Sequence, residues 1–168
     1  SVYNQRKHNF DALKDIRDDY IDMAILIQRS LPRNATYIRV HVGGDFFTKA
    51  YMQAWYLVAE KNPNIIFYAY TKSIKWMSEL EYLRPDNFRI TASYGGKEDA
   101  IIDELNLKSA KVVFHPSETN LPIDHNEYYA INDEGNFSLV LHGTQRAGSK
   151  ASKALSKMIA EGINPNYS

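Results

Sequence analysis

The sequence predicts an α/β fold in which five mainly parallel strands alternate with helices and form a partial (β/α) barrel with its helices on one face. Three observations lead to this prediction. Runs of β-branched and aromatic residues recur between amphipathic stretches, and Gly, Pro and Asn separate the two kinds of segment. The strand-like runs are apolar on one face only, whereas a parallel sheet between two helix layers is apolar on both. The alternative is a flat sheet whose polar face is solvated or meets a partner.

The elements before residue 72 contain the clearest strand–helix–strand unit. A long amphipathic helix is predicted from Asn9 to Leu31, because apolar residues recur at helical spacing up to Pro32. A strand then ends at a tight glycine turn, and a helix that ends at Asn62-Pro63-Asn64 leads to a parallel neighbour. The predicted segments are the strand 37–42, the turn Gly43-Gly44-Asp45, the helix 48–61 and the strand 65–70.

The same alternation continues to the end of the chain. The predicted helices are 73–83, 97–105 and 149–161, and the predicted strands are 88–93, 111–114 and 137–141. Residues 115–136 contain two prolines and show no sustained period. A loop of this length is more often functional or partner-covering than idle.

Alternation with a period of two separates the faces of these strands. The face expected under the helices carries Ile38, Val40, Phe67, Ile90, Phe114 and Leu139. The opposite face carries Arg39, His41, Tyr70, Lys72, Ser93, His115 and His142. These polar side chains are expected to share one cavity or one open surface.

Composition limits the function classes. The 168 residues are interpreted as a single α/β domain, residues 1–168. Twenty basic and twenty acidic side chains cancel, which disfavours general nucleic-acid binding. The absence of Cys excludes thiolate catalysis and cysteine-ligated clusters within these residues. No apolar run is long enough to span a membrane, so a soluble intracellular protein is expected.

Polar groups lie at or just beyond the C-terminal end of each predicted strand, and in a (β/α) barrel these ends meet at one mouth. Histidine transfers protons near neutral pH, and a lysine beside other cations or desolvated by aromatic rings has a lowered pKa. The candidate catalytic residues are therefore His41, Asp45, Lys72 and His142. The alternative for each histidine is an ordinary hydrogen-bonded core residue.

Ligand binding is predicted for residues around the same mouth. They are Arg39, Gly43, Gly44, Tyr70, Ser93, His115, Thr144, Gln145, Gly148, Ser149 and Lys150. The last five belong to the turn before the final helix, where unpaired N–H groups and the helix dipole attract phosphate. The spacing is not that of a P-loop. The alternative is that Ser149 is an ordinary N-cap and the lysines are a solvated face.

No metal is predicted. His41, Asp45, His115 and His142 carry nitrogen and oxygen donors that suit a divalent ion. No closely spaced ligand motif groups them, so a metal site is the lesser alternative.

Six segments together resemble the phage and plasmid family called gene product 88: HVGGDFF, FYAYTKS, TASYGG, VVFHPSE, LPIDH and LHGTQRAGSKASKAL. The resemblance covers most of the chain. It implies a viral origin, the host-cell cytoplasm, and a radical-SAM-like partial barrel. That family often starts with a cysteine-rich segment, which is missing from this sequence, so no iron–sulfur cluster is expected in this chain. Gly43-Gly44-Asp45 resembles the turn with which radical-SAM proteins hold the amino group of S-adenosylmethionine.

Two functions fit these observations. The first is binding of a nucleotide-like or phosphate-bearing small molecule, with S-adenosylmethionine among the candidates, at the C-terminal ends of the strands by an enzyme or an enzyme-derived protein. The alternative is a non-catalytic interaction protein that inhibits or modulates a host or defence factor. The twelve tyrosines and two tryptophans suit pockets and interfaces alike.

Overall fold

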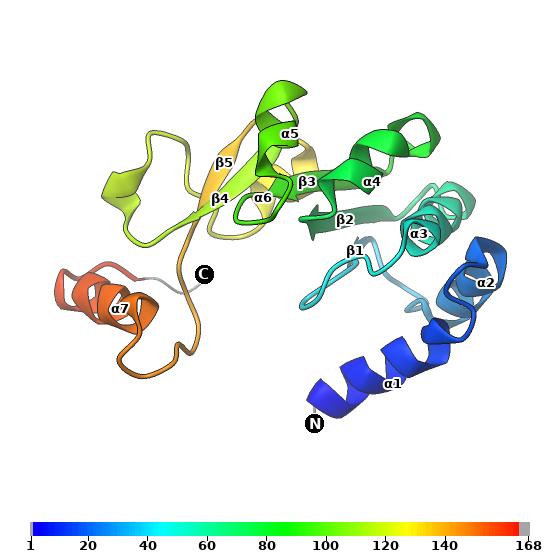
Figure 1. Cartoon of the computed structure of the whole chain (residues 1–168), viewed down its shortest axis with the longest axis horizontal. Coiled ribbons are helices and arrows are strands. Elements are labelled where there is room, and N and C mark those ends of the chain that lie inside the picture. Colours follow the sequence, from blue (N-terminus) through cyan, green and yellow to red (C-terminus); the bar gives the residue numbers. More distant parts are fainter. Residues whose placement is uncertain (1, 165–168) are drawn as a thin grey trace.

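The computed structural model of the protein describes residues 2–164, which contain one five-stranded sheet. All neighbouring strands are parallel and follow the order of the sequence. Figure 1 shows the sheet curling into a half-barrel, which confirms the predicted partial (β/α) barrel. The strands are β1 (Tyr37–Arg39), β2 (Ile66–Thr71), β3 (Phe88–Ser93), β4 (Ser109–Val113) and β5 (Phe137–Val140).

Helices connect these strands and cover the convex face of the half-barrel from β1 to β4 (Figure 1). The α-helices are α1 (Val2–Lys14), α2 (Tyr20–Ser30), α3 (Lys49–Lys61), α4 (Ile74–Glu79), α5 (Asp99–Glu104), α6 (Tyr128–Asn132) and α7 (Lys150–Ala160). Two short 3-10 helices are η1 (Glu81–Leu83) and η2 (Pro116–Glu118).

The prediction of one continuous helix over 9–31 is wrong, because the chain breaks between α1 and α2. Asp19 has an extended backbone, and its carboxylate accepts hydrogen bonds from the N–H groups of Ile21 and Asp22. This N-cap starts a new helix, since an aspartate satisfies the free amides of a first turn better than it fits a helix interior. α2 then packs along α3, so two helix layers lie outside β1 and β2.

The convex core is built from aromatic side chains of α3, β2 and β3. The rings of Phe67 and Phe88 stack with centroids 6.3 Å apart, and Tyr56 meets Phe88 edge-on at 4.9 Å. Phe67, Phe88 and Ile90 lie on the helix side, as the alternating pattern predicts. Close packing of these large side chains holds the two central strands against α3.

The predicted faces of the last two strands are wrong. Val113 and Val140 pack with Met158 of α7, so these residues form the helix-covered side. Leu139 and Phe137 instead face the concave side, where they pack with residues of α6. In β5, Phe137 is buried on the concave face and Val140 on the helix-covered face, so alternation alone does not identify the outer face.

The segment 115–136 explains this second cover, because it contains α6, which contacts β2 and β3 on the concave face. Before α6, Ile123 pairs in parallel with Ser138 at the outer edge of β5. Asp124 is 2% exposed, and its carboxylate accepts from the N–H groups of Asn126, Tyr128 and Tyr129. The buried carboxylate thereby fixes the start of α6.

Candidate functional site

Asp45 joins the ends of the first two strands. Its Oδ1 accepts from the Thr71 hydroxyl at 2.6 Å and from the Phe46 N–H at 2.7 Å, and its Oδ2 accepts from the Lys72 N–H at 2.7 Å. Hydrogen bonds to a carboxylate are stronger than those between neutral groups. The glycine-rich turn after β1 is therefore tied to the C-terminal end of β2.

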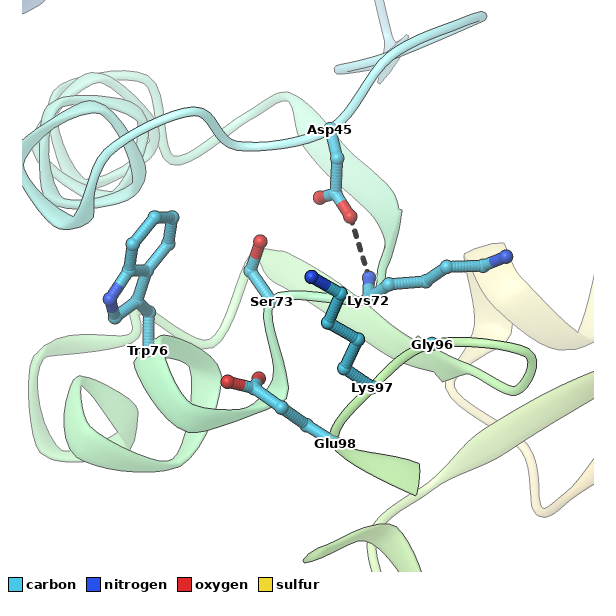
Figure 2. Close-up of a pocket in the computed structure, with 7 residues that line it drawn as sticks. All are labelled: Asp45, Lys72, Ser73, Trp76, Gly96, Lys97 and Glu98. Atoms are coloured by element: carbon cyan, nitrogen blue, oxygen red, sulfur yellow. Dashed lines mark hydrogen bonds between the residues drawn. The ribbon is translucent and has the colours of Figure 1, made fainter. Parts of the chain in front are cut away.

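A pocket of about 320 Å³ opens beside this contact, at the C-terminal ends of β2 and β3. Its lining consists of Asp45, Lys72, Ser73, Trp76, Gly96, Lys97 and Glu98. Figure 2 shows the Trp76 indole on one side and the Lys97 ammonium directed toward Ser73. Within the described residues Lys97 makes no ion pair or hydrogen bond, and it is exposed. Parallel α/β folds bind ligands at this end of their strands.

Lys72 contributes its backbone to the pocket more than its side chain. Its ammonium donates to the Gly95 carbonyl at 3.2 Å and extends away from the pocket centre (Figure 2). The carboxylate of Asp99 accepts from the N–H groups of Gly95 and Gly96, each at 2.9 Å. A Cβ on Gly96 would lie 3.2 Å from Lys72 Cβ, so this loop can approach β2 closely only with glycine there.

His41 lies near the first strand end but outside the pocket lining. Its ring meets Phe46 edge-on at 4.7 Å, and its Nε2 lies 3.4 Å from the Tyr51 hydroxyl. Burial lowers the pKa of His41 to about 4, against a smaller opposing effect of the Asp45 carboxylate. The imidazole is therefore neutral at pH 7.

On the concave face, charged and aromatic side chains from β1 and β2 contact Glu127. Arg39 forms an ion pair with Glu127, and the Tyr68 hydroxyl donates to the same carboxylate. The Arg39 guanidinium also lies 5.3 Å from the centre of the Tyr70 ring. Burial, followed by the contact with Glu127, raises the pKa of Tyr68, so its hydroxyl remains a donor at neutral pH.

The remaining predicted site residues belong to the α7 region. His115 Nδ1 accepts from the Ser117 N–H at 3.2 Å, so Nε2 carries the proton that it donates to Glu161 at 2.8 Å. His142 donates through Nδ1 to the Val140 carbonyl at 3.0 Å. The contact between His115 and Glu161 attaches the C-terminal end of α7 to the segment after β4, whereas the His142 contact is local.

The turn before α7 has ordinary local contacts. Ser149 is the N-cap of α7, since its hydroxyl accepts from Ser152 N–H at 3.1 Å, and Lys150 lies 5.3 Å from the centre of the Phe114 ring. Gln145 donates to the His142 carbonyl, and Thr144 and Gly148 are exposed. Figure 1 shows α7 at the β5 end of the half-barrel, whereas α1, α2 and α3 lie at the β1 end.

The structure therefore divides the predicted site into three groups. Asp45 and Lys72 meet at the pocket, with Gly43 and Gly44 in the adjoining turn and Ser93 at the end of β3. A second group, Arg39, His41 and Tyr70, surrounds the end of β1. His115, His142 and the residues of 144–150 form the third, near α7. The four candidate catalytic residues do not converge.

Sequence reasoning missed most of the pocket lining. The sequence predicts Ser73 only as the first residue of the helix 73–83 and assigns Trp76, Gly96, Lys97 and Glu98 to no site. Their signal is their position directly after two predicted strands, since loops at that end of parallel strands carry ligand contacts. Sequence also missed Glu127, because no local pattern brings a residue of a long loop to β1.

Two features are absent from residues 2–164. No group of three or more His, Asp or Glu side chains in this range is placed to hold a metal ion. None of the helices described there has the length and apolarity that crossing a membrane requires.

A curled sheet of parallel strands with a pocket at the C-terminal strand ends defines a partial (β/α) barrel. Residues 1–159 match the sequence model of the family "Gene product 88", so the chain belongs to this phage family. A similar protein is "Gene 88 protein" of Mycobacterium phage L5, 26% identical over 148 residues. The match covers 76% of this chain and 61% of that relative, so the chain spans less than two thirds of its length. No solved structure matches the chain significantly.

Proposed function

We propose that the protein binds a nucleotide-like or phosphate-bearing small molecule in the pocket at the C-terminal ends of β2 and β3. The observation that carries the proposal is the position of the Lys97 cation, which has no partner within residues 2–164, beside the Ser73 hydroxyl and the Trp76 indole. An ammonium and a hydroxyl bind phosphate or carboxylate oxygens, and an indole supplies a surface for a nucleobase.

The volume and the lining suit a ligand of this class. Small-molecule sites begin at about 300 Å³, and the pocket has about 320 Å³. Asp45 and Glu98 add carboxylates at its margin, which suit a ligand with an amino group as well as an anionic one. S-adenosylmethionine combines these groups with an adenine ring and therefore belongs among the candidates.

Calorimetric titration of AMP, ATP, S-adenosylmethionine and inorganic phosphate tests this function. Lys97→Ala should weaken binding by about tenfold or more, because a charge-assisted hydrogen bond is lost. Trp76→Leu should weaken only the ring-bearing ligands. Lys75→Ala is the matched control, since Lys75 is 65% exposed on α4 and does not line the pocket. Equal affinity of Lys97→Ala and wild type, or no binding by any of the four compounds, would remove the proposal.

A second function is favoured by the outer surface of α2. Ile21 and Ile25 are 51% and 41% exposed and lie one helical turn apart, so they form an apolar stripe outside the core. Such a stripe suits contact with a host or defence factor that the protein inhibits or modulates.

Tagged protein recovered from host cells tests this alternative. The double variant Ile21→Ser/Ile25→Ser should lose a stoichiometric partner that wild type retains. The control Tyr82→Ser, at a residue that is 81% exposed on η1, should keep it. Identical partner sets for all three proteins would contradict a role of α2.

A further inference from the structure

Two arginines and a tyrosine form one row across the concave face of the half-barrel. In the register of the sheet, Arg39 of β1 is paired with Tyr68 of β2, and Tyr68 is paired with Arg89 of β3. Two strand spacings separate the arginines, so their Cα atoms lie roughly 10 Å apart. All three side chains point to the side opposite the convex helices. The row therefore presents a hydroxyl donor between two guanidinium groups.

Both arginines are neutralised by carboxylates of one short segment. Glu127, the N-cap of α6, pairs with Arg39, and Asp133, its C-cap, lies 3.8 Å from Arg89. Asp133 also accepts from Lys108, which is 15% exposed on the side chain. Glu127 and Asp133 both have left-handed backbones, with φ of 65° and 57°. Non-glycine residues adopt this conformation at an energetic cost, and here it delivers both carboxylates to the row.

Two buried polar atoms on the concave face have no hydrogen-bond partner in residues 127–133. Thr91, paired with Tyr70, is completely buried, and its Oγ1 has no hydrogen-bond partner within the described residues. The buried Nε of Arg89 has none there either. Buried polar groups are normally hydrogen-bonded, so these two donors point to a more polar occupant than α6.

We propose that this concave face is a second binding site, for a small molecule with two phosphate or carboxylate groups. Residues 127–133 are a lid over this site, and their carboxylates bind the two arginines when no ligand is present. The two anionic groups of the ligand replace Glu127 at Arg39 and Asp133 at Arg89. The Tyr68 and Thr91 hydroxyls donate to the ligand between them. The site is separate from the pocket beside Trp76.

The lid is suited to opening because its helix is short. α6 has five residues, fewer than an isolated helix needs to be stable, so its order depends on the contacts of Glu127, Asp133 and the Asp124 carboxylate. Opening the lid therefore also breaks the hydrogen bonds that Asp124 accepts from the N–H groups of Tyr128 and Tyr129, which lie within residues 127–133. The ligand binds only when the lid is open. Its apparent affinity is therefore its affinity for the open state multiplied by the fraction of molecules in that state.

The test uses inorganic pyrophosphate and glutarate, which distinguish a phosphate ligand from a dicarboxylate. Titrations are followed by calorimetry and by the NMR signals of the Arg39 and Arg89 Nε–H groups. The double variant Glu127→Gln/Asp133→Asn removes both lid charges with little change of shape. It should bind at least one of the two compounds about tenfold or more tightly than wild type.

Two further variants define the outcome. Glu134→Gln is the matched control, because Glu134 follows the lid and accepts from Tyr128 rather than from an arginine, so it should bind as wild type does. Adding Arg39→Gln to the double variant should abolish the gain. No gain for either compound, or a gain that survives Arg39→Gln, would overturn the proposal. The shifts of the Arg39 and Arg89 Nε–H signals report binding on the concave face itself, which separates it from the pocket beside Trp76.

Wild-type protein provides an independent measurement if the double variant does not fold. Hydrogen exchange of residues 127–133 should accelerate as pyrophosphate or glutarate is added, because the ligand displaces the lid. If hydrogen exchange of residues 127–133 stays constant up to the solubility limit of both compounds, these residues are not a lid.

Discussion

Asp45 has a structural role that its position in a glycine-rich turn does not reveal. Its carboxylate joins three donors from the β1–α3 loop and from the end of β2. The sequence predicted the turn and an acidic group at a strand end, both of which the structure contains. It could not predict the hydrogen bonds, because Thr71 is distant in the chain and shows no motif of its own.

Asp45→Ala should therefore lower the free energy of unfolding by about 2 to 4 kcal/mol, because it leaves the hydroxyl of the buried Thr71 and the Lys72 N–H without this acceptor. Urea denaturation followed by circular dichroism measures the change. Glu104→Ala, at an exposed residue of α5, should change stability by no more than about 0.5 kcal/mol. Equal stability of Asp45→Ala and wild type would show that the loop holds without this carboxylate.

His41 should make the protein less stable in mild acid. Its pKa is about 4 in the folded protein because of burial, against 6.5 as the ordinary value. Between these pH values the unfolded chain binds a proton that the folded protein does not, so stability falls as the pH falls through this window. The contribution is on the order of 1 to 3 kcal/mol.

Unfolding free energies at pH 7, 6, 5 and 4 test this contribution. His41→Phe keeps an aromatic ring against Phe46 and Tyr51 and should reduce the loss of stability toward pH 4. His125→Phe, at an exposed residue, should follow the wild-type profile. A His41→Phe profile that is parallel to wild type would contradict a neutral, buried His41.

Among the elements, α6 shows most clearly where sequence patterns are insufficient. The sequence predicts the ends of the five strands to within three residues, because their apolar runs lie between turns that contain glycine or proline. α6 lies in a segment without periodicity, and its order comes from tertiary contacts: the Asp124 carboxylate and two ion pairs with distant strands. Apolar residues of α6 also pack against Phe137 and Leu139, which explains why these residues of β5 face the concave side.

Asp124→Ala should release the start of α6. Three N–H groups lose their acceptor at a residue that is 2% exposed, so local order of residues 126–132 should decrease and stability should fall by about 2 to 4 kcal/mol. Hydrogen exchange measured by mass spectrometry reports the local change. His125→Ala, next to it and exposed, is the control that should leave exchange in this segment unaltered.

α7 is attached mainly through Met158, which is completely buried against Val113 and Val140. Met158→Ala should cost about 2 to 5 kcal/mol in the stability of this attachment and accelerate exchange in α7 before the rest of the protein. Ile159→Ala, at a side chain that is 60% exposed, should have little effect. Equal exchange rates in the two variants would mean that α7 does not depend on this contact.

At the scale of the whole molecule, the half-barrel follows from a few physical rules. Helical crossovers make successive strands parallel neighbours, and one-sided apolar patterns in β1 to β3 place the crossover helices on one side. These rules are visible in the sequence, so the architecture could be predicted. A candidate site depends on which strand ends approach each other, and a half-barrel brings β2 and β3 together while it leaves the α7 region apart.

NMR mapping of a titration shows whether a ligand binds in the pocket beside Trp76. With AMP, ATP or S-adenosylmethionine added to labelled protein, we expect the largest shifts at the backbone amides of Ser73, Gly96 and Lys97 and at the Trp76 indole N–H. A ligand that saturates while these four signals stay unchanged, with the shifts confined to residues 144–150, would show that it binds outside the pocket beside Trp76.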